Sequence, residues 1–143
     1  VFQFYNLIPA FSALDNVILP LLAQGQSLSA ARRRGQELLA GMGLAQRMKH
    51  RPNALSGGEQ QRVAIARALA PAPAIVLADE PTANLDSKAA STLLEIMETL
   101  NREEKITFIF STHDPRVMKM ARRVITLEDG RVVSDERRSG LER

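Results

Sequence analysis

Several residue types are missing or scarce in this chain of 143 residues, which has no cysteine, no tryptophan and only 4% aromatic residues. The absence of cysteine excludes disulfide bridges and thiolate metal sites. So few aromatic rings argue against a surface on which nucleic-acid bases stack. No apolar run reaches the roughly 18 residues that mark a membrane-spanning helix.

The residues that are present are typical of a globular protein. Hydrophobic residues account for 45% and charged residues for 24%, which supports a packed core, and the length favours one domain. The net charge of +3 is compatible with a membrane-surface partner but too weak to indicate nucleic acid. The chain begins at Val1, within an apolar segment, so we expect the natural N-terminus to lie further upstream.

The first half of the chain is expected to be helical, because its apolar residues recur at helical spacing. Serines stand where helices would begin, and glycine or proline where they would end. The expected helices follow Ser12, with a kink or an end at Pro20; Ser29, with an end at Gly41 or Gly43; and Ser56, with a helix from Glu59 to about Ala70.

The second half alternates apolar runs of strand length with helical patterns, which predicts a parallel sheet and an α/β fold. We expect buried strands in "AIVLADE" and "ITFIFST", a helix begun by Asp86 or Ser87 between them, and a hairpin turn at Asp129 and Gly130. The proline-rich segment 71–73 is the expected seam between a mainly helical part, residues 1–70, and a strand-and-helix part, residues 71–143.

Ser56, Gly57 and Gly58 stand at the start of the third expected helix. Two glycines allow an anion to approach the backbone closely, and the helix directs its unbonded N–H groups and positive dipole end to the same place. The serine adds a hydroxyl donor. A helix cap after a glycine turn has the same residues, and taken alone the motif is more typical of a cap.

Asp79 and Glu80 end the first expected strand. An apolar strand that delivers an aspartate at its carboxyl end is the arrangement in which that carboxylate holds Mg²⁺ near a nucleotide. Glu80 comes next and could polarise an attacking water as a general base. Taken alone, the pair is equally compatible with capping acids at the end of a structural strand.

His113 follows the second expected strand, in "STHD". An imidazole there could reach the same crevice and form a hydrogen bond with a phosphate or with the attacking water. By itself, a lone histidine is more often an ordinary strand-end residue. The order of all three motifs along the chain is what gives them weight.

Taken together, these motifs resemble those of the ABC ATPase family from Val1 to about Val133. "LSGGEQQRVAIARAL" is similar to the signature motif and its helix, and "IVLADEPT" to the Walker B strand with the catalytic glutamate. "ANLD" resembles the D-loop, His113 the switch histidine and Gln3 the Q-loop glutamine. The resemblance implies a P-loop NTPase-like fold, present as a helical subdomain followed by the C-terminal half of the parallel-sheet core.

The subfamily can be inferred from longer stretches. "FQFYNLIPAFSALDNVILPLL" and "LADEPTANLDS" resemble the ATPases of lipoprotein-release and macrolide-export transporters. Two features depart from the wider family: Glu59 stands where glutamine is commoner, and Ala83 and Asn84 stand where many members have serine and alanine. Neither departure contradicts an ATPase function.

The resemblance implies ATP and Mg²⁺ as cofactors, a second ATPase subunit in a head-to-tail dimer, a transmembrane permease subunit, and no nucleic-acid partner. It also implies a role for each matching residue. Glu80 would activate the water and His113 would orient it, Asp79 and Gln3 would contact Mg²⁺, and Ser56, Gly57 and Gly58 would contact the γ-phosphate of the partner's ATP, with Glu59 and Asp86 completing the nucleotide-binding set.

The phosphate-binding P-loop, Gly-x-x-x-x-Gly-Lys-Ser/Thr, is missing, because none of the eight glycines is followed by lysine. Its amides and lysine cradle the phosphates, and in the family it lies upstream of the Q-loop. We therefore expect a partial chain of a transporter ATPase on the cytoplasmic face of the bacterial inner membrane, powering export or lipoprotein release. We expect the chain alone to have negligible ATP affinity and no turnover.

Two alternatives remain. The first is a non-transport ABC protein, although the compact stretch between Gln3 and Ser56 leaves no room for the long coiled coils of DNA-repair members. The second is a non-catalytic remnant without a P-loop, against which the intact Glu80 and His113 count.

Three other groups of side chains have more than one interpretation. The run of arginines 32–34 is expected to be a solvated face, or else a contact for the permease or anionic lipid. Arg62 and Arg67 could contact nucleotide, but they are expected instead to pair with nearby acids. Tyr5, Leu7 and Ile8 could form core packing or a groove for the permease.

Overall fold

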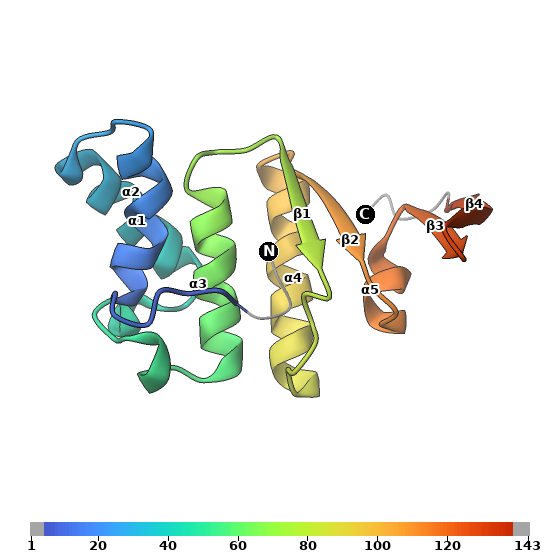
Figure 1. Ribbon diagram of the computed structural model, residues 1–143, viewed down its shortest axis with the longest axis horizontal. Coiled ribbons are helices and arrows are strands. Elements are labelled where there is room, and N and C mark those ends of the chain that lie inside the picture. The colour runs from blue at the N-terminus through green and yellow to red at the C-terminus, as the bar shows by residue number, and fades with distance from the viewer. Residues whose placement is uncertain (1–4, 139–143) are drawn as a thin grey trace. The chain divides into compact units, whose positions relative to one another are not determined.

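The computed structural model describes residues 5–138 and divides into two compact units, one ending at Ser111 and the other beginning at Thr112. The seam predicted at residues 71–73 separates groups of motifs rather than compact units and stays a prediction. The first unit contains α1 (Ala13–Ala23), α2 (Leu28–Gly41), the 3₁₀ turns η1 (Ala45–Arg47) and η2 (Pro52–Ala54), α3 (Gly57–Leu69), β1 (Ile75–Asp79), α4 (Ser87–Glu103) and β2 (Thr107–Ser111) (Figure 1). The second contains α5 (Pro115–Met120), β3 (Arg123–Glu128) and β4 (Arg131–Arg137).

Polar caps begin the helices of the first unit, as the sequence predicts for Ser12 and Ser56. The prediction for α2 is wrong by two positions: Ser27 is the cap, because its hydroxyl oxygen accepts the N–H of Ala30 at 3.3 Å, and Ser29 lies inside the helix. Pro20 does not end α1, which continues to Ala23. α2 ends at Gly41, followed by Gly43 with a φ of 70°, in agreement with the predicted stop.

Helices α1, α2 and α3 pack against one another and bury a shared apolar core (Figure 1). Gly35 in α2 permits the close approach of α1, since a Cβ there would lie 2.6 Å from Cγ2 of Ile18. Burying an aliphatic side chain of this size contributes about 1.5–3 kcal/mol. The largest buried aliphatic residues of this core include Val17, Leu21, Leu39, Leu44, Ile65 and Leu69.

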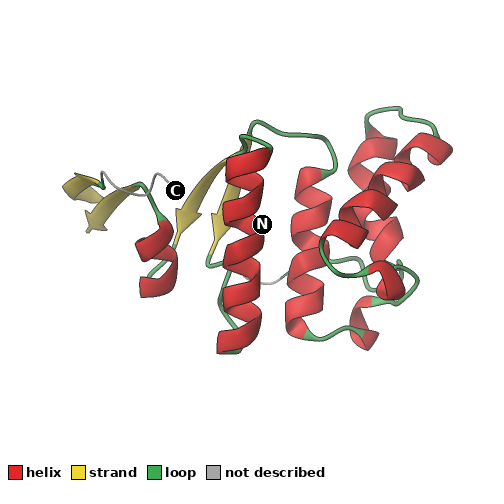
Figure 2. Cartoon of the chain, turned by 180° about the vertical axis from the view of Figure 1, so that it is seen from behind, coloured by secondary structure: helices red, strands yellow, loops and turns green. Residues whose placement is uncertain are grey.

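Strands β1 and β2 pair in parallel, with Ile75 opposite Thr107 and Asp79 opposite Ser111. Helix α4 connects them and lies against one face of this two-stranded sheet (Figure 2). A parallel pair needs such a crossover, so the predicted strand-helix-strand order is confirmed. The cap predicted at Asp86 or Ser87 is Asp86, whose carboxylate accepts the N–H of Ala89 at 2.8 Å.

The prediction of fully buried strands is wrong for the described residues. Val76 and Ala78 are buried, whereas Leu77 is 64% exposed and Ile109 is 53% exposed. The alternation arises because successive strand side chains point to opposite faces and the described part of the chain covers the side occupied by α4. A continuous apolar run shows that both faces avoid water, but it does not show which segment covers them.

The second unit consists of a short helix and an antiparallel hairpin. The turn predicted at Asp129 and Gly130 is confirmed: both have positive φ, 47° and 74°, as a two-residue turn matched to strand twist requires. Arg123 and Asp135 pair across the strands at 2.7 Å. No helix among residues 5–138 is long and apolar enough to cross a membrane.

Candidate functional site

Ser56 caps α3 through a reciprocal pair of hydrogen bonds. Its hydroxyl oxygen accepts the N–H of Glu59 at 3.3 Å, and the Glu59 carboxylate accepts the N–H of Ser56 at 2.8 Å. Both backbone donors are thereby satisfied. In this cap the hydroxyl oxygen is the acceptor, so its hydrogen can be donated either to the Glu59 carboxylate, which the Ser56 hydroxyl helps to keep charged, or to an oxygen outside the chain. Capping and anion binding are compatible at this serine when the hydrogen is donated outward.

The carboxylate of Glu59 is stabilised in its charged form. The hydrogen bond from the Ser56 backbone N–H is the largest cause that lowers the pKa of Glu59; burial opposes it, and the Ser56 hydroxyl and the charges of Arg47 and Arg62 assist it. The Arg47 guanidinium lies 3.3 Å from Glu59. Since the pKa is lower in the folded state, this stabilisation is present above the unfolded pKa and is lost as pH falls through the folded one.

Gly57 and Gly58 are packed tightly against other parts of the chain. A Cβ on Gly57 would lie 2.9 Å from the Tyr5 hydroxyl oxygen, and one on Gly58 would lie 3.1 Å from the Cβ of Ala89 in α4. The signature segment therefore lies against the N-terminal segment and the start of α4. The sequence suggested anion approach or a glycine turn before a helix cap as the reason for these glycines, and the structure adds a packing reason.

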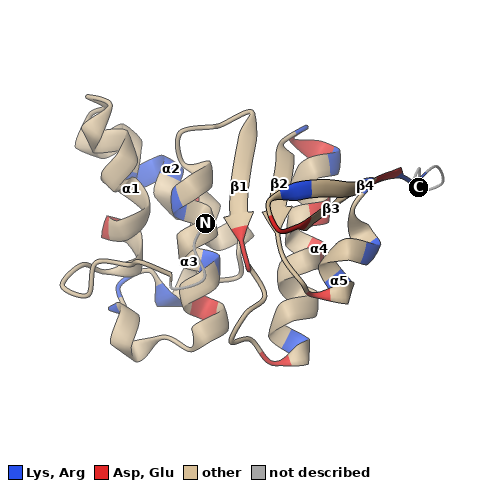
Figure 3. Ribbon diagram, turned by 45° about the vertical axis from the view of Figure 1, so that its right-hand side comes forward, with Lys and Arg blue, Asp and Glu red and all other residues tan. Residues whose placement is uncertain are grey.

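Asp79 and Glu80 bring two carboxylates to the carboxyl end of β1, where the acidic residues are visible in Figure 3. Glu80 has a φ of 42°, a sparsely populated conformation for a residue with a Cβ. Its N–H donates to the carbonyl of Ser111 at 2.8 Å. The carboxyl ends of parallel strands are where ligands bind in open α/β sheets.

Carboxylate oxygens are the ligands that Mg²⁺ prefers, so Asp79 fits a magnesium site. No group of three or more His, Asp or Glu side chains gathers as a metal cage within residues 5–138. Magnesium at nucleotide sites takes one or two carboxylates and completes its coordination with phosphate and water. The donor set at this strand end is therefore appropriate to a magnesium–nucleotide complex.

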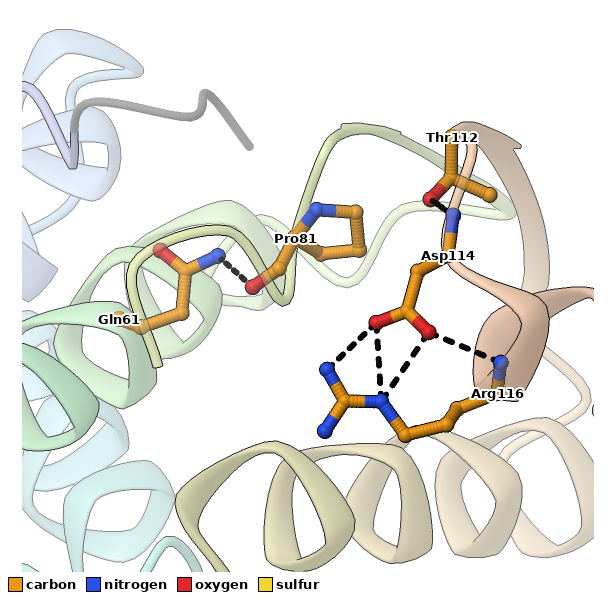
Figure 4. Close-up of polar contacts among 5 residues, drawn as sticks. All are labelled: Gln61, Pro81, Thr112, Asp114 and Arg116. Atoms are coloured by element: carbon orange, nitrogen blue, oxygen red, sulfur yellow. Dashed lines mark hydrogen bonds and ion pairs between the residues drawn. The ribbon is translucent and has the colours of Figure 1, made fainter. Parts of the chain in front are cut away.

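Hydrogen bonds within the first unit fix the turn that follows Glu80. Within the turn, the N–H of Ala83 donates to the Glu80 carbonyl at 3.0 Å. From α3, the Gln61 side-chain amide donates to the Pro81 carbonyl at 2.7 Å, as Figure 4 shows. Thr82 is 3% exposed. The signature helix and the Asp-Glu strand end are thus joined by a direct side-chain contact.

In the second unit, His113 lies two residues after the end of β2 and is exposed. The next residue, Asp114, donates its N–H to the Thr112 hydroxyl oxygen at 3.0 Å and pairs with Arg116 at 2.7 Å (Figure 4). Asp114 also caps α5. The role of His113 toward the attacking water stays a prediction. Gln3 lies outside the described residues, and its predicted role is likewise untested.

The first unit contains a cavity of about 130 Å³ that is separate from the predicted site. Binding cavities for drug-sized ligands span roughly 300–1,000 Å³, so this one is too small for a nucleotide. Its lining comes from α2, α3, α4 and their connections, and includes no predicted site residue: Arg34, Leu38, Leu69, Ala72, Pro73, Leu100, Glu104 and Ile106.

Comparison with known families identifies the family to which the chain belongs. The family model described as "ABC transporter" matches residues 1–83, more than half of the chain. The chain belongs to the ABC transporter family. A second model, described as "AAA domain, putative AbiEii toxin, Type IV TA system", matches residues 51–119, which include the signature helix and the Asp-Glu strand end.

Relatives in the ABC family support the predicted subfamily. The lipoprotein-releasing system ATP-binding protein LolD of Anaeromyxobacter dehalogenans is 50% identical over 98% of this chain and 60% of its own length. The macrolide export ATP-binding/permease protein MacB of Rhodopseudomonas palustris is 53% identical over 94% of this chain and 20% of its own. The chain therefore spans about 60% of the length of the LolD relative.

A solved structure confirms the fold class. A dimeric ATP-binding cassette in a post-hydrolysis state, bound to ADP and Pi, superposes with a TM-score of 0.85 and 44% sequence identity. The match covers 98% of this chain and 63% of that chain. The predicted α/β fold of P-loop NTPase type, present in part, is borne out.

Arg67 in α3 has backbone carbonyls as partners. Its guanidinium donates to the carbonyls of Asn6 at 2.7 Å and Tyr5 at 3.0 Å, so the prediction that it pairs with an acid is wrong. Arg62 agrees better with that prediction, since its charge lowers the pKa of Glu59. The Arg67 contact, which we call the Arg67 tether, holds the segment after Gln3 against the signature helix.

Buried amides were missed as well. Asn16 is fully buried, accepts the N–H of Ile8 at 2.8 Å and donates to the carbonyls of Ile8 and Ser12. Gln61 is also buried. An amide that falls within the apolar face of a helix is the signal that could have identified both residues, because burial of such a group requires a partner.

Proposed function

We propose that this chain is part of the ATP-hydrolysing subunit of an ABC transporter that powers lipoprotein release from, or export across, the inner membrane. One observation carries the proposal: a capped S-G-G helix start and an Asp-Glu strand end are joined within one compact unit by Gln61. The identity of 50% to a LolD protein supports the lipoprotein-release assignment.

In this proposal Asp79 and Gln3 hold Mg²⁺ bound to ATP, and Glu80 accepts a proton from the attacking water. His113 orients that water. Bound ATP supplies the phosphoanhydride bond that is cleaved. The remaining residues act on the nucleotide of the partner subunit: Ser56, Gly57 and Gly58 bind its γ-phosphate at the N-terminus of α3, with Glu59 and Asp86 beside them.

The proposed partners are a second ATPase subunit in a head-to-tail dimer and a transmembrane permease subunit. The dimeric cassette among the structural relatives supports the first, and the MacB relative, which is an ATP-binding/permease protein, supports the second. The proposed location is the cytoplasmic face of the inner membrane, where such a permease would hold the ATPase.

The test uses the full-length protein encoded by the natural gene. Glu80→Gln is expected to lower kcat by at least about 100-fold, because an amide cannot accept the proton of the water, while binding of ATP is retained. Glu95→Gln, an equivalent change at an exposed position of α4, is the control and should leave kcat unchanged. Undiminished hydrolysis by Glu80→Gln, or a wild-type protein that does not hydrolyse ATP, would contradict the proposal.

A further inference from the structure

We propose that Gln61 is a positioning residue that fixes the turn carrying Glu80 to the signature helix. The inference rests on the proposed function, because it takes Glu80 as the catalytic base. Gln61 is 1% exposed, and its amide nitrogen lies 2.7 Å from the carbonyl oxygen of Pro81. Pro81 follows Glu80 directly, so this bond acts on the next peptide group along the chain (Figure 4).

The backbone at Glu80 requires such support. A glutamate with a φ of 42° persists only where its surroundings fix it. On the strand side, the N–H of Glu80 is bound to Ser111, and within the turn its carbonyl accepts from Ala83. Gln61, in α3, adds a third hydrogen bond, to the carbonyl of Pro81. The three bonds approach the turn from β2, from the turn itself and from α3.

The Gln61 side-chain oxygen indicates that this residue does more than fill space in the core. The Gln61 carbonyl oxygen is buried and has no hydrogen-bond partner among the described residues. An unsatisfied buried acceptor is costly, and a leucine of similar size would avoid that cost. The bond to Pro81 is therefore the feature of Gln61 that space filling does not explain.

This contact gives a route between two functional groups in one subunit. Gln61 lies about one helical turn beyond the signature glycines, which in the proposed function bind the partner's ATP. A displacement of the start of α3 is passed through the Gln61 amide to the turn that holds Glu80. Engagement of the partner's nucleotide is thereby coupled to the position of the catalytic carboxylate.

The first experiment measures backbone hydrogen exchange in the full-length protein encoded by the natural gene. Gln61→Leu and, as a second variant, Gln61→Met remove the donor and substitute an apolar side chain of similar size. The amides of Ala83 and Leu85 are expected to exchange about tenfold faster, with α1 and α2 unchanged. Gln36→Leu, at an exposed position of α2, should have no effect on the turn. Equal acceleration throughout the first unit, or none at Ala83, overturns the proposal.

The second experiment measures steady-state ATP hydrolysis by the full-length protein. Both Gln61 variants are expected to lower kcat by about 10- to 100-fold, as small misplacements of catalytic groups do, with the KM for ATP nearly unchanged. An unchanged kcat, or a raised KM at unchanged kcat, overturns the positioning role. If the wild type hydrolyses no ATP, the proposed function fails, and the exchange measurement still decides whether Gln61 holds the turn.

Discussion

At the scale of single residues, Arg67 shows how a charged side chain contributes without an ion pair. Its guanidinium binds the carbonyls of two consecutive residues, Tyr5 and Asn6. The fixed fork of donors suits two neighbouring acceptors, which a single ammonium group cannot match in the same geometry. The segment that follows Gln3 is thereby attached to the helix that carries the signature glycines.

Replacement of Arg67 by methionine should lower the free energy of unfolding by about 1–3 kcal/mol, the range for losing hydrogen bonds from a charged group. The measurement is chemical denaturation of the chain. Arg33→Met, at an exposed position of α2, is the matched control and should change stability by less than about 0.5 kcal/mol. Equal stability of the two variants would show that the tether contributes nothing.

Caps formed by neighbouring residues were predictable from the sequence, whereas contacts between distant residues were missed. Ser56 was predicted to begin α3, and the hydrogen bonds of this cap join it to Glu59, three positions along the chain. Gln61 is separated from Pro81 by 20 positions, and Arg67 from Asn6 by 61. Only the fold brings these groups together, and their acceptors are backbone carbonyls, which every residue has.

At the scale of elements, the packing of α1 on α2 depends on Gly35. A Cβ at this position would lie 2.6 Å from Cγ2 of Ile18 and 2.9 Å from Cδ1 of Leu14. Alanine is normally favoured over glycine inside a helix by about 1 kcal/mol. The helical preference for alanine and the steric clash with Ile18 oppose each other. At 2.6 Å the clash is severe enough to outweigh the helical preference.

Gly35→Ala is therefore expected to lower the free energy of unfolding by roughly 1–2 kcal/mol, since overpacking costs about 1–3 kcal/mol. Gly41→Ala is the control in the same helix, because a Cβ there would meet nothing within 4 Å. Gly41→Ala should be neutral or slightly stabilising. The comparison uses thermal or denaturant unfolding, and an unchanged or raised stability of Gly35→Ala would refute the packing argument.

Element boundaries show the limit of local pattern. Ser27 and Ser29 both precede the apolar face of α2, and the spacing of apolar residues is compatible with either as the first cap. Ser27 is the cap because its backbone is extended, whereas the backbone of Ser29 is already helical. The hairpin at Asp129 and Gly130 was predictable because its two residues are themselves suited to positive φ.

At the scale of the whole molecule, the residues to which we assign roles are only part of what binding of a nucleotide requires. They include two carboxylates at a strand end and a glycine-rich helix start, but the sequence has no Gly-Lys step. A P-loop supplies most of the contacts to the β- and γ-phosphates. Affinity for ATP should therefore be negligible in the 143-residue chain itself.

Thermal unfolding of the chain with and without MgATP measures this affinity. A ligand that binds only the folded state raises stability according to its concentration relative to Kd. At millimolar MgATP we expect the midpoint to move by less than about 1 °C, which corresponds to a small fraction of 1 kcal/mol for a domain of this size. A rise of several degrees would refute the prediction.

The Arg67 tether has a consequence for comparative genomics. Because the guanidinium binds main-chain oxygens, the contact does not depend on which side chains occupy positions 5 and 6, apart from the left-handed backbone that suits Asn6. Methods that infer proximity from correlated substitutions would therefore find no pairing between these positions and Arg67. An engineer could vary Tyr5 to alter its contact with Gly57 and still keep the attachment.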